Sequence, residues 1–193
     1  ERRRCAVFPV AVSARKFHAS PPTSDQRARL ACDIAYVSHH SETPDAMHDR
    51  LVREASRDPL AARIFQDLRS PVREIALDSM GRLPAIELRL AAQEVASRVL
   101  GAEPPDATVT HVTRQYCFPM ADRIIRHETL AWAADIAGRR GWRLNIHGRA
   151  WESHPTLAPF ARGELAHDDE LRASYHCAGV HLHASSNWLL HQR

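Results

Sequence analysis

The chain contains three short apolar segments, and its hydrophobic pattern is otherwise mainly helical. Residues 32–37 (CDIAYV), 142–147 (WRLNIH) and 179–183 (GVHLH) have the length and residue types of strands. Long stretches with helical periodicity lie between them. Strands that alternate with helices pair in parallel through right-handed crossovers. We therefore expect an α/β fold built on a small parallel sheet.

Local start and stop signals predict the helices. Thr43 followed by Pro44 is a strong helix start, because Thr caps the first turn and Pro suits the first helical position. Further helices are expected from Pro84 to a stop at Gly101, and from about 118 to 137 with a stop at Gly138. Residues 19–27 (ASPPTSDQR) have the composition of a linker.

Composition excludes several classes of protein. The 193 residues are 44% apolar and 25% charged, which argues against disorder, and no apolar run approaches the roughly 18 residues of a membrane span. A net charge of +3 is too small to indicate nucleic-acid binding. The four cysteines form no CxxC pair, which predicts reduced thiols and a cytoplasmic protein.

A series of weak motifs follows the second predicted strand in a definite order. They are Gly148-Arg149-Ala150-Trp151, Gly163-Glu164-Leu165, an acidic helix 168–175 ending in Tyr175, the strand 180–183, and Gln192-Arg193. This order resembles the donor domain of GT-B glycosyltransferases, particularly the CgeB-like (spore-protein-like) group.

The N-terminal part carries the same resemblance. Residues 33–38 (DIAYVS) are similar to the first donor-domain strand of the family, and residues 8–13 (FPVAVS) followed by Phe17 are similar to its interdomain crossing. Two positions depart from the family pattern. Ser38 stands where glycine is usual, and Ala150 replaces the second glycine of the turn.

The resemblance implies a partial Rossmann-like sheet, the C-terminal domain of a GT-B enzyme, with a helical elaboration. Residues 1–31 would be an interdomain crossing and linker. Residues 32–193 would be a truncated donor-binding domain with a helical insert at about 57–118. The full enzyme would transfer a sugar from a nucleotide-sugar to an acceptor glycan or another molecule without a metal or other cofactor. Its acceptor-side domain would precede Glu1, and this chain alone would be inactive.

The expected site lies beyond the carboxyl ends of the strands, where open parallel sheets bind their ligands. The loops there are 38–42, 148–151 and 184–187, and we expect 38–41, 148–149 and 163–165 to converge. The resemblance implies the following donor-binding residues: Ser38, His39, Gly148, Arg149, Gly163, Glu164 and Arg193. Each also has a purely structural interpretation, as a polar loop or a turn, and Trp151 can either contact a nucleobase or fill the core. No catalytic residue is assigned.

Two other functions stay open. The first is a non-catalytic nucleotide-binding or protein-interaction module of the same fold. The second is a metal-binding protein, because His181 and His183 share one face of a strand close to His176 and Cys177. No CxxC, HExxH or DxD signature supports a metal, so we predict none.

Overall fold

The three predicted strands form one parallel sheet. The computed structural model describes residues 19–40, 42–79 and 84–184. Strands β1 (Cys32–Val37), β2 (Leu144–His147) and β3 (Ala178–Leu182) lie in the order β2-β1-β3, and both pairings are parallel. This confirms the prediction of a mixed α/β fold in which the three strands are parallel neighbours.

A minimal fourth strand-like segment extends the outer edge of β2. Ala161 forms an isolated parallel bridge with Ile146. The amide of Arg162 donates to the Ile146 carbonyl at 2.9 Å, and the amide of Gly148 donates to the Gly163 carbonyl at 2.9 Å. Residues 161–163 therefore continue the sheet beyond β2, although they are too few to count as a strand.

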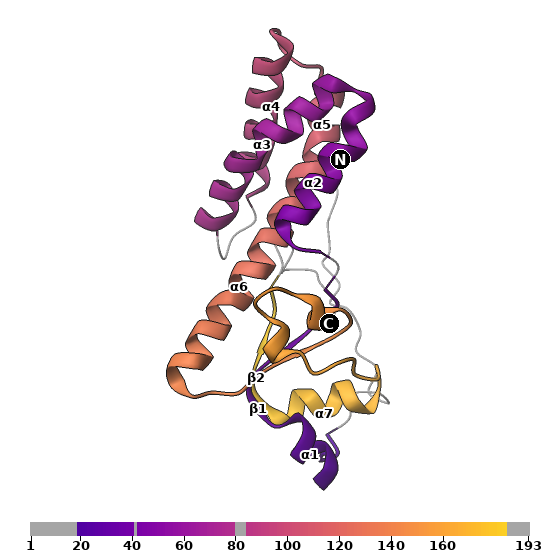
Figure 1. Ribbon diagram of the computed structural model, residues 1–193, viewed down its shortest axis with the longest axis vertical. Helices are drawn as coiled ribbons and strands as arrows, with labels where there is room; N and C mark the ends of the chain where they lie inside the picture. The colour runs from indigo at the N-terminus through magenta and orange to yellow at the C-terminus, as the bar shows by residue number, and fades with distance from the viewer. Residues whose placement is uncertain (1–18, 41, 80–83, 185–193) are drawn as a thin grey trace, which may run out of the picture.

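Most of the described chain is helical, and the helices group around α6, which runs most of the length of the molecule (Figure 1). At one end, α2 to α5 pack around the first half of α6; at the other end lie the sheet, α1 and α7 (Figure 1). The helices are α1 (Ser24–Leu30), α2 (Pro44–Glu54), α3 (Pro59–Asp78), α4 (Ala85–Leu100), α5 (Asp106–Val112), α6 (Phe118–Arg140) and α7 (Asp169–Cys177). Short helical turns are η1 (Ala55–Arg57), η2 (Thr113–Cys117), η3 (Trp151–Ser153) and η4 (Ala158–Phe160).

Two separate apolar clusters form the interior. The helical cluster joins α2 to α5 with the first half of α6 and includes Leu68, Leu88 and Tyr116. The sheet cluster joins the second half of α6 to the strands through Leu130, Ala133 and Ala137 and includes Leu144 and Trp151. The helix α6 is thus shared by both clusters, which explains why apolar residues occur on more than one of its faces.

Two expectations about helix ends need correction. The long helix ends at Gly141 rather than Gly138, because Gly141 adopts the left-handed conformation (φ 66°) that closes a helix, whereas Gly138 stays helical. Residues 24–30, part of which was predicted as linker, form α1. Thr23 and Gln26 make a reciprocal capping box there, a start signal that the Pro-rich composition masks.

The long helix also begins earlier than a regular pattern suggests. Residues 106–140 are helical throughout, with a π-helical turn at 113–117 just before Pro119. Pro119 has no N–H, and its ring would meet the carbonyl four residues before it in a regular helix. The wider π turn accommodates the proline without ending the helix. Among the described residues, no helix is both long and apolar enough to cross a membrane.

Candidate functional site

Backbone hydrogen bonds hold three loops together at the carboxyl end of the sheet. The Ser38 amide donates to the His147 carbonyl at 2.9 Å, and the His40 amide donates to the Arg149 carbonyl at 2.9 Å. The Gly148 amide donates to the Gly163 carbonyl, also at 2.9 Å. The loops after β1 and β2 and the 163–165 turn therefore converge, as expected from the predicted parallel sheet.

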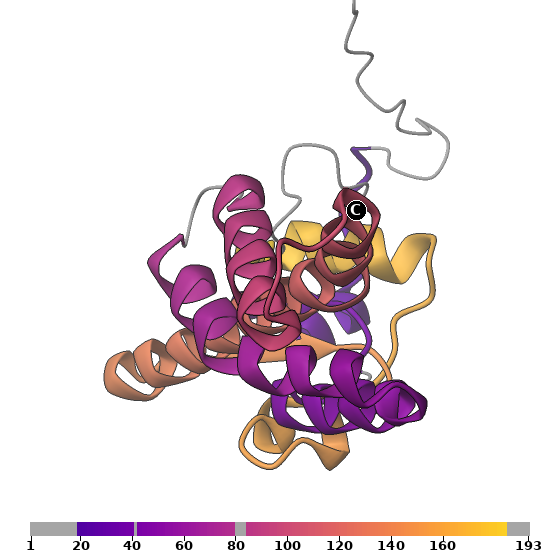
Figure 2. The same ribbon diagram turned by 90° about the horizontal axis from the view of Figure 1, so that it is seen from above.

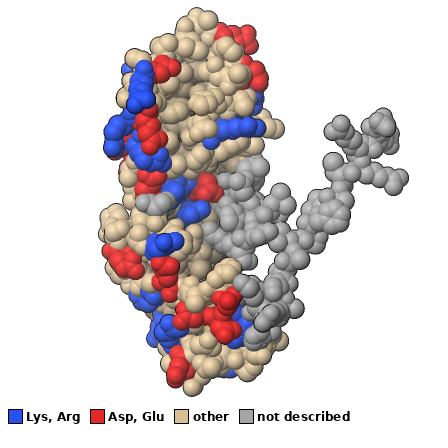
Figure 3. All heavy atoms as spheres, turned by 90° about the vertical axis from the view of Figure 1, so that its right-hand side faces the viewer, with Lys and Arg blue, Asp and Glu red and all other residues tan. Residues whose placement is uncertain are grey.

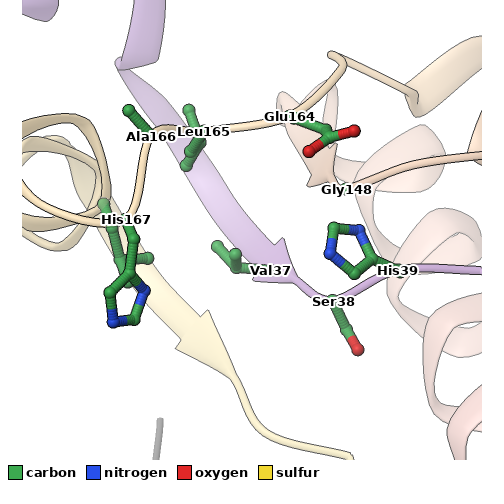
Figure 4. A pocket seen from close by; sticks show the side chains of 9 residues that line it. Val37, Ser38, His39, Gly148, Glu164, Leu165, Ala166 and His167 are labelled. Atoms are coloured by element: carbon green, nitrogen blue, oxygen red, sulfur yellow. The ribbon is translucent and has the colours of Figure 1, made fainter.

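These loops enclose a pocket of about 450 Å³. Its lining is Val37, Ser38, His39, Gly148, Glu164, Leu165, Ala166, His167 and Leu171. Figure 4 shows Glu164 and the His39 ring near Gly148, with His167 on the other side of Val37.

The pocket includes four of the predicted donor-binding residues: Ser38, His39, Gly148 and Glu164. Arg149 and Gly163 adjoin it in sequence without lining it. Arg193 lies outside the described residues, as do Ser41, 185–187 and the expected crossing at 8–17. That the residues bind a donor stays a prediction.

Gly148 is required for the close approach of two loops. Its φ is 137°, and a Cβ atom on it would lie 2.1 Å from the Ser38 carbonyl oxygen. A side chain there is therefore excluded by both conformation and space. Gly163 also has a positive φ (73°), but nothing lies within 4 Å of its Cβ position.

Arg149 is tied to neighbouring groups. Its amide donates to His39 Nδ1 at 2.9 Å, so a neutral His39 ring carries its proton on Nε2. Its Nε lies 3.2 Å from a carboxylate oxygen of Glu164, in an ion pair whose side chains are 69% and 52% exposed. The guanidinium therefore has a carboxylate partner already, and a phosphate would have to compete with Glu164 for it.

A second group of polar side chains lies on α6, beside the end of β1. Arg126 places Nη1 3.5 Å from Ser38 Oγ and pairs with Asp122 at 3.1 Å. Arg123 donates to the Glu42 carbonyl at 3.4 Å. Burial, and then the neighbouring Arg126, lower the pKa of Arg123. Sequence reasoning missed both residues, because 25 arginines in the chain give no single one a signal.

Three histidines cluster around Trp151, which is fully buried and fills the core. The ring centroids of His40, His127 and His154 lie 5.0 to 5.4 Å from one another. His154 Nδ1 accepts the amides of residues 156 and 157, so its Nε2 carries the proton and lies 3.1 Å from His127 Nδ1. Burial lowers the pKa of His127 to about 3. No spacing in the sequence links these three positions.

The arrangement of these histidines does not suit a metal ion. Both nitrogens of His154 are already engaged, and a metal at Nε2 would need the proton on the nitrogen that accepts the two amides. Within residues 19–40, 42–79 and 84–184, no group of three or more His, Cys, Asp or Glu could hold a metal. In the segment considered for metal binding, His181 contacts the Ser174 carbonyl at 3.0 Å and stacks on Tyr175.

Another buried histidine lies on the opposite face of the sheet. His147, at the end of β2, is only 2% exposed. Burial lowers its pKa to about 4. Both faces of the sheet therefore hold a neutral histidine near the carboxyl ends of the strands.

Comparison with known proteins adds no relative. No family model, no curated protein and no solved structure matches the chain.

Proposed function

We propose that this chain binds a nucleotide-sugar, as the donor-side domain of a GT-B glycosyltransferase. The main observation in support is the pocket at the carboxyl end of the parallel sheet, where loops from distant parts of the chain meet. The order of weak motifs predicted this convergence. A volume of about 450 Å³ lies within the range of small-molecule sites.

The order of the pairings supports a Rossmann-like fold. With the short pairing at 161–163 included, the order along the sheet is 161–163, β2, β1, β3. This corresponds to 3-2-1-4 in chain order, the first part of the classic dinucleotide-binding arrangement. In that arrangement the ligand lies where the strand order reverses, between the first and fourth strands, here β1 and β3. The pocket adjoins the end of β1 and the helix that leads into β3.

The lining suits the parts of a nucleotide. Val37, Leu165 and Leu171 offer apolar surface to a planar base, and the Glu164 carboxylate can accept hydrogen bonds from sugar hydroxyls. The Nε2–H of a neutral His39 is a donor for an oxygen of the ligand. The complete enzyme would then pass the sugar to an acceptor glycan or another acceptor held by a second domain.

Calorimetric titration with UDP, GDP, ADP and CDP tests the proposal. One of these nucleotides should bind, and His39→Ala should weaken its binding about tenfold through the lost hydrogen bond. His111→Ala is the matched control, because His111 is exposed on α5 in the helical part. If a folded protein binds none of the four nucleotides, the proposal is wrong. Binding without transfer by the complete protein would favour the non-catalytic nucleotide-binding module instead.

A further inference from the structure

Two arginines one helical turn apart on α6 face the end of β1. Arg126 reaches Ser38 Oγ with Nη1 at 3.5 Å, and Arg123 reaches the Glu42 carbonyl with Nη1 at 3.4 Å. The loop after β1 thus lies against both guanidinium groups. Figure 3 shows arginine side chains on the surface at this level, between the helical part and the sheet.

Arg126 has an acidic partner, whereas Arg123 has none among the described residues. The Arg126 side chain is only 15% exposed, and its Nε is buried without a hydrogen-bond partner. Asp122 forms an ion pair with Arg126 at 3.1 Å. The Glu42 carboxylate is held by Arg50, at 2.8 and 3.1 Å. Among the described residues, no carboxylate lies within ion-pair distance of Arg123.

Such an arrangement costs free energy in the absence of an anion. Half-buried guanidinium groups lose hydration, and two of them side by side repel each other. The lowered pKa of Arg123 has these two causes, burial first. The 11-residue helix α2 begins directly after this loop and adds the positive end of its dipole.

We propose that Arg123 and Arg126, with the Ser38 hydroxyl, form an anion site for a phosphate or diphosphate group. Ser38 joins this site to the pocket, because it lines the pocket and its hydroxyl lies near Arg126. Figure 4 shows the Ser38 side chain directed away from Glu164 and the His39 ring. The identification of the anion as the diphosphate of a nucleotide-sugar rests on the function proposed above.

We expect the phosphate contact at this site rather than at Arg149, which is one of the donor-binding residues that the resemblance implies. Both Arg149 and Arg126 have a carboxylate partner, but Arg149 is 69% exposed and Arg126 only 15%, so water weakens a phosphate contact of Arg149 more. The arginines of α6 are more deeply buried, and hydrogen bonds from charged donors are stronger where water is excluded.

Titration of inorganic pyrophosphate into the folded chain at low salt tests the site directly. Arg123→Gln and Arg126→Gln should each weaken pyrophosphate binding at least about tenfold. Arg149→Gln should change it less than about twofold. Arg139→Gln is the matched control, because Arg139 is also on α6 and pairs with the acid four residues before it, as Arg126 does. Arg126→Lys keeps the charge and serves if Arg126→Gln does not fold; intermediate affinity is expected.

Several results would overturn the site. One is a wild-type protein that binds no pyrophosphate at millimolar concentration. Another is a loss of binding in Arg149→Gln while both α6 variants bind normally. Nucleoside diphosphates separate the two proposals. If pyrophosphate binding depends on α6 and no nucleoside adds affinity, the anion site stands and the donor function fails. If a nucleoside diphosphate binds regardless of both arginines, the donor function stands and this site fails.

Discussion

The helical part and the sheet part of this molecule are built from different interiors. The helical cluster consists of apolar residues; among the buried polar side chains beside it, His48 bonds to Tyr116 at 2.7 Å, and the Ser79 hydroxyl has no hydrogen-bond partner. Around the sheet, the buried residues include Asn145, His147, His127 and His154, and three ring nitrogens of His127 and His147 have no hydrogen-bond partner. Buried polar groups of this kind lower stability, so proteins keep them mainly where they serve a function. From this contrast we expect the helices to supply most of the stability and the sheet part to carry the proposed site.

The largest effect is expected from Gly148→Ala, which tests how tightly the loops of the sheet are joined. The new Cβ would lie 2.1 Å from the Ser38 oxygen at a φ of 137°, so the backbone must move, at a cost of about 4 kcal/mol. Urea unfolding followed by tryptophan fluorescence measures this, because the described tryptophans (Trp132, Trp142 and Trp151) lie on the second half of α6 and beside the sheet. Gly163→Ala, with open space, should cost about 1 kcal/mol. Equal losses in the two variants would contradict the steric argument.

Leu68→Ala tests whether the two parts unfold together. Leu68 is fully buried in the helical cluster, so its truncation should cost about 3 kcal/mol. Leu144→Ala, in the sheet cluster, is the counterpart. Because α6 runs through both clusters, we expect each variant to shift circular dichroism at 222 nm and tryptophan fluorescence by the same amount. Separate transitions would mean that the helical part is an independent unit.

Lowering the pH should destabilise the sheet part. Burial lowers the pKa of His127 to about 3 and of His147 to about 4 from the usual 6.5. As the pH falls, the histidines of the unfolded chain therefore take up protons before those of the folded protein. The free energy of unfolding is thus highest above pH 6.5 and decreases as the pH falls toward the pKa values of the folded protein. From pH 7 to pH 5.5 the two rings should cost about 2 kcal/mol together.

Urea unfolding at both pH values measures the loss of stability, and His127→Gln should reduce it by about 1 kcal/mol. A pH dependence that is unchanged in His127→Gln would show that this ring is not the cause.

Local signals explain which parts of the fold could be predicted. Thr43-Pro44 begins a helix and Gly101 ends one, as expected, because capping depends on neighbouring residues. The apolar segments predicted the strands, and the helical connections between them predicted parallel pairing. Gly138 was a wrong stop, since either Gly138 or Gly141 fits a helix end and only the final turn distinguishes them.

The site was only partly predictable, because its two halves depend on different kinds of information. Ser38 and Gly148 follow strands, so their convergence is a consequence of a parallel sheet. Arg126 lies in the middle of a helix, and only the packing of α6 against the loop after β1 brings it to Ser38. Tertiary contacts of this kind leave no trace in residue spacing, and the same holds for His127 and His154.

The smallest effect is expected from Tyr116→Phe, which tests how well the helical interior tolerates an unpaired polar group. Tyr116 is fully buried, stacks on Phe65 and shares a 2.7 Å hydrogen bond with His48 Nδ1. Tyr116→Phe keeps the ring but removes the hydroxyl, so we expect a loss of about 1 kcal/mol at pH 7, read from urea unfolding at 222 nm. Replacing His48 with an apolar residue in the same protein should recover part of that loss, because the His48 Nδ1 that Tyr116→Phe leaves without a partner is then absent. If Tyr116→Phe costs nothing, the helical interior tolerates an unpaired ring nitrogen as readily as the sheet part does, and the expected division between the two regions would fail.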